Sequence, residues 1–352
     1  MCNRCYECVP IYCLRSVWRQ KWFILVALVF CLSITLIILR EPTYSPDAYR
    51  TAIKHDRFID EAMKSTYQDV MNRWYNLTDA QEWYNGKVIS KSDTTNWVRY
   101  LNEIRQRWIV WNHDSSKPYN LEEPEIEDQS MGQASVIRKI FDDMRNGFFV
   151  ECGAYDGETR SNTLALERLL GWKGLLVEAD SINFSKMLLK NRKAYLTPTC
   201  LALQPYPTVN SFLMADNVGR LHEPNATDSN LPNSPDVAHS GDHILVQCFP
   251  FHHLMAALNV TVVNYFSLDI EGHELEVLKT IPFDEISIET LSVEFAHLEV
   301  GKTELIDFMS SKGYYVYSFV VRTDHLAHDI IFVKKDMGKF RFQERVIIDA
   351  GH

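Results

Sequence analysis

The sequence is short of positive charge and, after its first 39 residues, short of cysteine. Its 36 lysines and arginines face 46 aspartates and glutamates, which gives a formal net charge of −10 and argues against non-specific binding to nucleic acid. Eight cysteines in 352 residues exclude a small disulfide-dense protein. A hydrophobic content of 46% excludes a disordered chain. The length allows one large domain or two medium ones.

Net positive charge and most of the cysteines are concentrated in the first 39 residues, and net negative charge in the remainder. Residues 1–39 contain Arg4, Arg15, Arg19 and Lys21 against Glu7, a local charge of +3 that leaves −13 for the remainder. The same stretch holds five of the eight cysteines: Cys2, Cys5, Cys8, Cys13 and Cys31. The two parts therefore need separate interpretations.

One uncharged apolar run extends from Trp22 to Leu39, between Lys21 and Arg40. At about 1.5 Å per residue, a helix over this run would span about 27 Å, enough for a thin bilayer. A cleaved signal peptide is the alternative, but the run exceeds the usual apolar core and no A-x-A-like site follows it. We therefore predict an uncleaved signal anchor at residues 22–39.

The tail at residues 1–21 is predicted to be cytosolic, although basic residues on both sides of the anchor give only weak support for this orientation. Four of its cysteines suit palmitoylation beside the membrane; pairing with each other and a metal site at Cys2-x-x-Cys5-x-x-Cys8 are the alternatives. The rest of the chain is then lumenal or extracellular. Four glycosylation sequons fit this placement, at Asn76, Asn183, Asn225 and Asn259.

Residues 40–128 lack a clear fold signature, but apolar and aromatic residues recur there at helical spacing. We predict a helical stem whose tryptophans pack on the following domain; a partner-binding surface is the alternative. The acidic run from Asn120 to Ser130 is interrupted by proline and suggests a boundary at 128/129.

From residue 129 to 352 the chain alternates helix and strand patterns, which predicts an α/β domain with a mainly parallel sheet. A strand at 147–150 leads into a turn that contains Gly153 and Gly157. A second strand, at 174–177, ends at Glu178. This order indicates a nucleoside cofactor, because glycines permit close approach of the backbone and an acidic residue accepts ribose hydroxyls. The pattern G-x-G-x-x-G, which is typical of dinucleotide sites, is absent, and Asp156 favours S-adenosylmethionine over a dinucleotide.

A third cluster lies where a strand at 265–269 ends and a helix at 275–280 begins. It contains Asp269, Glu271 and Glu274, and such grouped carboxylates are costly unless they bind a cation, a proton or a helix N-terminus. Helix capping is the alternative role for the two glutamates. His273 would complete a metal site with Asp269 and Glu271, but we expect no metal, because no further Cys or His stands at ligand spacing. Glu294 ends the next strand, and His297 is a candidate general base.

At these residues the chain resembles the FkbM family of S-adenosylmethionine-dependent methyltransferases. The resemblance extends from Ser130-Met-Gly-Gln133 through the first two strand ends to YFSLDIEGHELEVLKTI and the final Asp329-Ile-Ile-Phe-Val. It implies a Rossmann-like methyltransferase fold and places Asp269, Glu271 and Glu274 beside the reacting methyl group. The cofactor contacts that it implies, with Asp180 added as a further candidate, are Glu151, Gly153, Asp156, Gly157, Glu178 and Asp180.

The anchor and the cysteine-rich tail add a resemblance to Star-like type II membrane proteins. That resemblance implies a factor that moves membrane-bound, growth-factor-type cargo between the endoplasmic reticulum, Golgi, endosomes or plasma membrane, with a cofactor site that can be vestigial. The alternative function is active O-methylation of a lumenal glycan, lipid or protein. Among the last three cysteines we expect a Cys200–Cys248 disulfide, because a crosslink at Cys152 would restrict the cofactor turn.

Overall fold

The computed structural model describes residues 61–77, 83–111, 117–222, 242–298, 301–323, 327–336 and 346–349. The chain divides into two compact units, Met1–Thr51 and Ala52–His352, and all of the described residues belong to the second. Within them, no helix has the length and apolar character needed to cross a membrane. The predicted anchor at 22–39 and the candidate palmitoylation sites at Cys2, Cys5, Cys8 and Cys13 lie outside the described residues.

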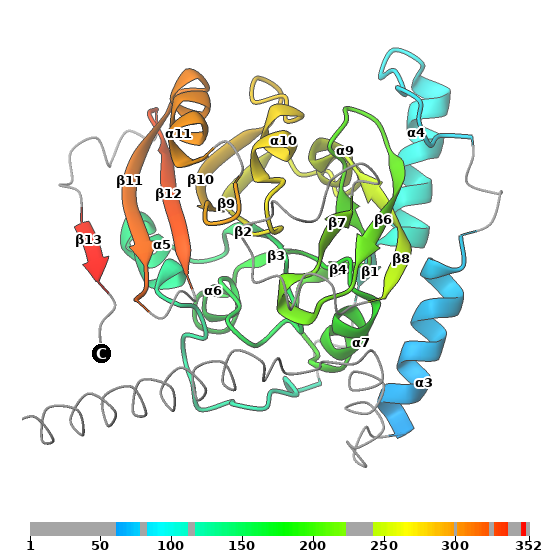
Figure 1. The fold of residues 1–352 in the computed structure, drawn as a ribbon, viewed down its shortest axis with the longest axis horizontal. Coiled ribbons are helices and arrows are strands. Elements are labelled where there is room, and N and C mark those ends of the chain that lie inside the picture. Colours follow the sequence, from blue (N-terminus) through cyan, green and yellow to red (C-terminus); the bar gives the residue numbers. More distant parts are fainter. Residues whose placement is uncertain are drawn as a thin grey trace, which may run out of the picture. The chain divides into compact units, whose positions relative to one another are not determined.

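A nine-stranded mixed sheet organises the described part of the chain (Figure 1). Its strands, in spatial order, are β1 (Val110–Trp111), β4 (Tyr195–Thr197), β3 (Lys173–Val177), β2 (Phe148–Cys152), β9 (Val262–Leu268), β10 (Ser287–Glu294), β12 (His328–Lys334), β11 (Tyr314–Val321) and β13 (Val346–Asp349). Pairing is parallel from β4 through β3, β2 and β9 to β10. Strand β12 is antiparallel to both of its neighbours. The expected α/β architecture is thus confirmed, with an antiparallel addition at one side.

The central parallel strands are apolar because they are covered on both faces. Phe149, Val150, Leu175 and Phe266 have no exposed surface. Six helices follow or precede these strands: α5 (Gln133–Phe141), α6 (Leu164–Leu170), α7 (Ser181–Leu189), α9 (Phe251–Ala257), α10 (Glu274–Lys279) and α11 (Gly301–Ser311). Crossovers through helices bring the carboxyl ends of β2, β3, β9 and β10 to one edge of the sheet.

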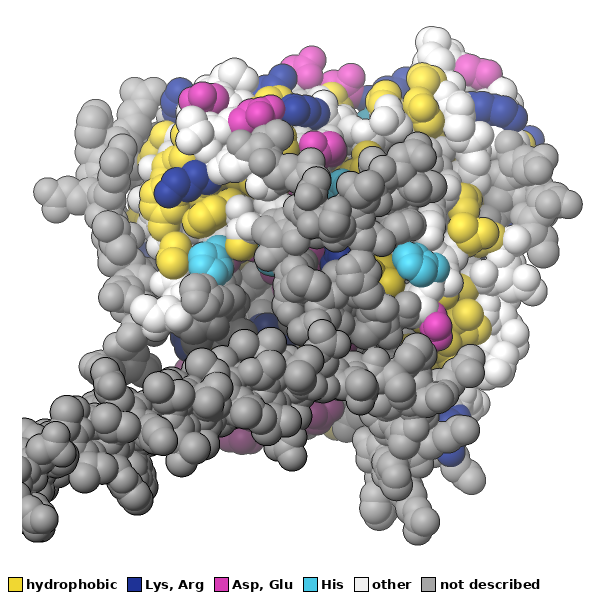
Figure 2. Space-filling model, viewed as in Figure 1, with side chains coloured by type: hydrophobic (Ala, Val, Ile, Leu, Met, Phe, Trp, Pro, Cys, Tyr) yellow, Lys and Arg dark blue, Asp and Glu magenta, His cyan; other side chains and the backbone are white. Residues whose placement is uncertain are grey.

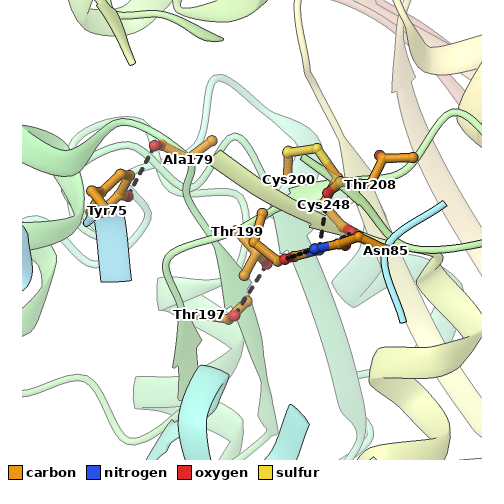
Figure 3. The surroundings of a disulfide bond; sticks show 9 residues. Tyr75, Asn85, Ala179, Thr197, Thr199, Cys200, Thr208 and Cys248 are labelled. Carbon is orange, nitrogen blue, oxygen red and sulfur yellow. Dashed lines mark hydrogen bonds between the residues drawn. A yellow bond between two sulfur atoms is a disulfide. The ribbon is translucent and has the colours of Figure 1, made fainter. Parts of the chain in front are cut away.

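A second sheet, which the sequence patterns did not predict, lies between β4 and β9 in the chain. It contains β5 (Cys200–Leu201), β8 (His243–Phe249), β6 (Thr208–Leu213) and β7 (Arg220–His222), in that spatial order, and a 3-10 turn, η4 (Asp216–Val218), precedes β7. Cys200 and Cys248 face each other in the parallel β5–β8 pair and form a disulfide, the pair expected from the sequence (Figure 3). Cys152 is a free, buried thiol.

The described part of the predicted stem belongs to the same hydrophobic core as the sheet. It contains α3 (Glu61–Val70), η1 (Met71–Tyr75), α4 (Thr94–Glu103), η3 (Ile104–Trp108) and β1. The Tyr75 hydroxyl donates to the carbonyl oxygen of Ala179 (Figure 3), and the Trp74 ring packs edge-on against Phe184. The predicted border at 128/129 therefore does not separate two bodies, because residues on both sides of it lie in one compact unit.

Exposed apolar side chains of the described residues are distributed over both sheets. On the face drawn in Figure 2, hydrophobic side chains are visible on the left and on the right. The exposed large hydrophobic residues on strands are Val209, Leu245, Val262 and Val321. The stem residues Trp74 and Trp108 are instead buried, so they contribute to the core and not to a docking surface for a partner.

Candidate functional site

Two adjoining cavities lie at the edge where the parallel strands end. The first has a volume of about 170 Å³ and is lined mainly by polar residues from the ends of β2, β9, β10 and β12. The second, of about 80 Å³, lies between the ends of β2 and β3 and the second sheet. Gly153, Tyr155, Asp269 and Glu271 line both cavities. A ligand with two chemically different halves would fit this arrangement.

Gly153 permits the two strand ends to meet. Its φ of +76° lies in the left-handed region, and a β-carbon there would overlap the carbonyl oxygen of Asp269. The backbone N–H groups of Gly153 and Ala154 both donate to the carbonyl oxygen of Val177. The first strand's turn is thus held against β3 and β9 with no side chain between them.

Glu178 lies at the end of β3 and lines the second cavity. Its carboxylate accepts the N–H of Tyr155 at 2.7 Å and the N–H of Asp180 at 2.8 Å, one on each oxygen. Burial, together with the charge of Asp180, raises the pKa of Glu178 to about 8. Each oxygen has a second lone pair, so the fixed carboxyl group can also accept hydroxyl groups from a ligand.

The first cavity has a strongly acidic lining. Burial raises the pKa of Asp269 to about 6, against the lowering effect of Arg160. Burial and the neighbouring Asp269 raise the pKa of Asp329 to about 7 and that of Glu294 to about 11. Arg160 is the only lysine or arginine among the described residues that line this cavity. The lining therefore favours a ligand that carries positive charge.

Several buried polar atoms of this lining have no hydrogen-bond partner among the described residues. They are Oε1 of Gln133, Oδ1 of Asn162, Oε2 of Glu294 and Nδ1 of His297. Leaving such atoms unpaired costs about 1–3 kcal/mol each. Their concentration along one cavity indicates that a ligand or solvent satisfies them.

His297 lies against two carboxylates. Its Nε2 is 3.4 Å from Oε2 of Glu271 and 3.7 Å from Oε1 of Glu294. Burial, with Arg220 and His328 nearby, lowers the pKa of His297 to about 4. The ring is therefore neutral at physiological pH and can accept a proton.

Four of the predicted site residues line neither cavity. Glu274 has no exposed surface, and its carboxylate accepts the N–H groups of Ile270 and Gly272. Glu274 thus holds the turn before α10, in line with the alternative role of helix capping, and it lines neither cavity. Asp180 is the N-cap of α7 and accepts the N–H groups of Ile182 and Asn183. Both carboxylates are used by the backbone of their own segments.

Asp156 and Gly157 also act within their own turn. The Asp156 carboxylate accepts the N–H groups of Glu158 and Thr159 and the Thr159 hydroxyl. A β-carbon on Gly157 would lie 2.7 Å from Cγ of Met187, so this glycine permits packing on α7. Neither residue lines a cavity, and their contact with a cofactor stays a prediction.

The Glu151 side chain holds a neighbouring segment of the backbone and also lines the first cavity. Its carboxylate accepts the Ser161 hydroxyl, the N–H of Asn162 and the Thr163 hydroxyl, which fixes the segment before α6. Burial raises its pKa. It also lines the first cavity.

The sequence patterns missed several residues of the lining. Tyr155 lies between Gly153 and Gly157, in a turn where the sequence motif consists of glycines and acidic residues only. The hydroxyl of Tyr155 donates to Asp216. Arg160 and Asn162 follow the same turn and carry no signal of their own. Gln133 and Asp329 belong to two segments that resemble the FkbM family, but the resemblance gives neither residue a role. In the structure the side-chain amide of Gln133 donates to Asp329 at 2.8 Å.

The sequons differ in accessibility. Asn76 and Asn259 are exposed. Asn183 is 2% exposed, and its side-chain amide donates to the carbonyl oxygen of Asp216, so glycosylation of Asn183 is incompatible with this fold. Asn225 lies outside the described residues.

The fold and the cavities define the class: an α/β protein with a polar site at the carboxyl ends of parallel strands. Residues 151–316 match the methyltransferase FkbM domain, and the chain therefore carries a methyltransferase-like domain over this segment. The match begins at Glu151 and includes both cavity-lining carboxylates of the 269–271 turn. No curated protein matches the chain.

Solved methyltransferase structures are similar to the chain at a low level. The delta-N METTL16 methyltransferase domain has 12% sequence identity and a TM-score of 0.32 over 70% of this chain and 98% of its own. A human methyltransferase 10 domain containing protein has 9% identity and a TM-score of 0.31, over 69% and 98%. A putative class I S-adenosylmethionine-dependent methyltransferase from Listeria monocytogenes has 12% identity and a TM-score of 0.31, over 82% and 93%.

Proposed function

We propose that the chain binds S-adenosylmethionine across the two cavities and transfers its methyl group to a hydroxyl oxygen. The observation that carries this proposal is the position of Glu178, which is fixed at the end of β3 in the second cavity. That cavity adjoins the acidic first cavity at a shared lining that includes Gly153, Tyr155 and Asp269.

The residues present fit the chemical groups of this cofactor. Glu178 accepts the ribose hydroxyls, and the second cavity holds the nucleoside between the β2 turn and the second sheet. Asp269 and Glu271 favour the positive end of the cofactor, which carries a sulfonium and an ammonium group. Gly153 lies in the lining that the two cavities share. Because it has no side chain, the turn after β2 can approach the backbone of Asp269 closely there.

The bound cofactor would supply an electrophilic methyl group. Transfer to a hydroxyl forms an O–C bond, breaks the S–C bond and releases the hydroxyl proton. His297 is placed to take that proton, because its ring is neutral and faces the first cavity. Glu271, 3.4 Å from Nε2, stabilises the resulting imidazolium.

Calorimetric titration of the purified full chain with S-adenosylmethionine tests the proposal. We expect saturable binding that Glu178→Gln weakens about tenfold, corresponding to about 1.4 kcal/mol. Glu289→Gln is the matched control, because Glu289 lies on β10 away from both cavities and bonds to Asn264. An absence of heat with the wild-type chain, in a sample shown to be folded by circular dichroism, would contradict the proposal.

The sequence also supports proposals on location and on a second role. We propose a type II membrane protein with this domain in an oxidising compartment, and the Cys200–Cys248 disulfide supports that placement. The Star-like role in moving membrane-bound cargo stays a prediction from resemblance. Cargo export that persists in cells expressing His297→Ala, which lacks the proposed base, would favour transport independent of catalysis; loss of export would favour the enzymatic function.

A further inference from the structure

Three carboxylates from two strands and a helix meet beside the first cavity. Strands β9 and β10 pair in parallel with Leu268 opposite Val293, so the next residues, Asp269 and Glu294, stand side by side at the same edge of the sheet. Helix α10 begins at Glu274 and brings the third carboxylate. One oxygen from each of the three lies within 4.8 Å of the others.

Glu294 provides an independent indication of a ligand. The residue is 6% exposed and lines the first cavity, yet its Oε2 has no hydrogen-bond partner among the described residues. Its other oxygen accepts the N–H of Ala296 at 3.0 Å. A buried carboxylate oxygen without a donor is costly, and a bound cation removes that cost.

The surrounding charges do not balance the cluster. Among the described residues, no lysine or arginine forms an ion pair with Asp269, Glu274 or Glu294; Arg160 only lowers the pKa of Asp269, and His297, 3.7 Å from Glu294, is neutral. Oε1 of Glu274 accepts the N–H groups of Ile270 and Gly272, whereas Oε2 accepts only that of Gly272 and keeps a free lone pair. Glu274 therefore closes the back of a site whose open side faces the cavity.

We propose that Asp269, Glu274 and Glu294 bind one divalent cation at the inner wall of the first cavity. Oxygen-only ligands select a hard ion, so Mg²⁺, Mn²⁺ or Ca²⁺ is expected and a thiophilic metal is not. The remaining coordination positions point into the cavity, where water or an acceptor hydroxyl completes them. Activation of an acceptor hydroxyl by this ion would rest on the proposed methyl transfer; the metal site itself does not.

Titration of the metal-stripped full chain with Mn²⁺, without cofactor, tests the site. Loss of the free Mn²⁺ signal in electron paramagnetic resonance should show one ion bound per chain, and Mg²⁺ or Ca²⁺ should compete for it. We expect Asp269→Asn and Glu294→Gln each to weaken Mn²⁺ binding at least tenfold. Glu276→Gln is the matched control, because Glu276 lies on α10 two residues after Glu274 and outside the cluster.

Two outcomes would overturn the inference: no saturable Mn²⁺ binding by the wild-type chain, or unchanged binding in both cluster variants. Both substitutions keep the side-chain shape, so thermal melts should show folded variants. Titration of the same samples with S-adenosylmethionine separates the two proposals. Cofactor binding without Mn²⁺ binding removes only the metal site, and Mn²⁺ binding without cofactor binding supports the metal site alone.

Discussion

The carbonyl oxygen of Asp269 occupies the space that a side chain on Gly153 would need. This contact joins the turn after β2 to the end of β9, the two places where the sequence has its most distinctive motifs. The nearness of the two cavities depends on it, because Gly153 and Asp269 line both.

Gly153→Ala should therefore destabilise the chain by more than the cost of its backbone conformation. Gly86→Ala is a matched control, because Gly86 has φ of +71° with no atom within 4 Å of an added β-carbon, against +76° at Gly153. We expect about 1 kcal/mol for the control and at least about 2–3 kcal/mol for Gly153→Ala, measured by urea unfolding. Equal losses for the two variants would mean that the contact with Asp269 relaxes easily.

The stability of the metal-free chain should fall as pH rises from about 5 to 8.5. Glu178 and Glu274 have pKa values raised to about 8, and Asp329 to about 7, chiefly by burial. The folded state therefore holds protons that the unfolded chain releases near pH 4 to 4.5, and this stabilisation is lost as pH passes the raised values. The slope can reach about 1.4 kcal/mol per pH unit for each proton held.

Urea unfolding at several pH values measures this slope. Glu178→Gln removes one of the titrating groups and should flatten the curve, whereas Glu289→Gln should keep the wild-type slope. Stability that rises over this pH range would contradict the assignment of buried, protonated carboxyl groups.

Reduction of the Cys200–Cys248 disulfide should lower the free energy of unfolding by about 2–4 kcal/mol, because the bond closes a loop with a sequence separation of 48. Chemical unfolding with and without dithiothreitol measures the loss. The double variant Cys200→Ser/Cys248→Ser should have the lower stability from the start and show no response to the reductant. A wild-type chain that is equally stable after reduction would argue that the bond contributes nothing.

Glycosylation of the chain expressed in animal cells should use Asn76 and Asn259 but not Asn183. The first two are exposed, whereas the Asn183 amide is buried against Asp216. Asn76→Gln and Asn259→Gln should each remove one glycosidase-sensitive increment in gel mobility, and Asn183→Gln should remove none. A chain with no glycosidase shift at all would contradict the lumenal placement.

Local sequence determined the strands of the parallel sheet and the two turns that build the site. Buried strands such as β2 and β3 are short, largely apolar runs, and each is followed directly by a glycine or an acidic residue, so Gly153, Glu178 and Asp269 could be found by position. The second sheet could not, because β6 and β7 lack a clear alternating pattern; β7 pairs with β6, and β6 in turn pairs with β8, from Leu213 opposite His243 to Thr208 opposite Cys248.

Only the tertiary structure decided which carboxylates face a ligand. Asp156 and Asp180 have the same chemistry as Glu178 and Asp269 and lie in the same motifs, but only the latter two line a cavity; Asp156 and Asp180 bond to the backbone of their own turn or helix. Burial and strand register, which depend on contacts distant in sequence, bring Glu294 beside Asp269 and leave one of its oxygens unpaired. The sequence by itself determined the residue types and the order of the strand ends; packing between those ends determined the site.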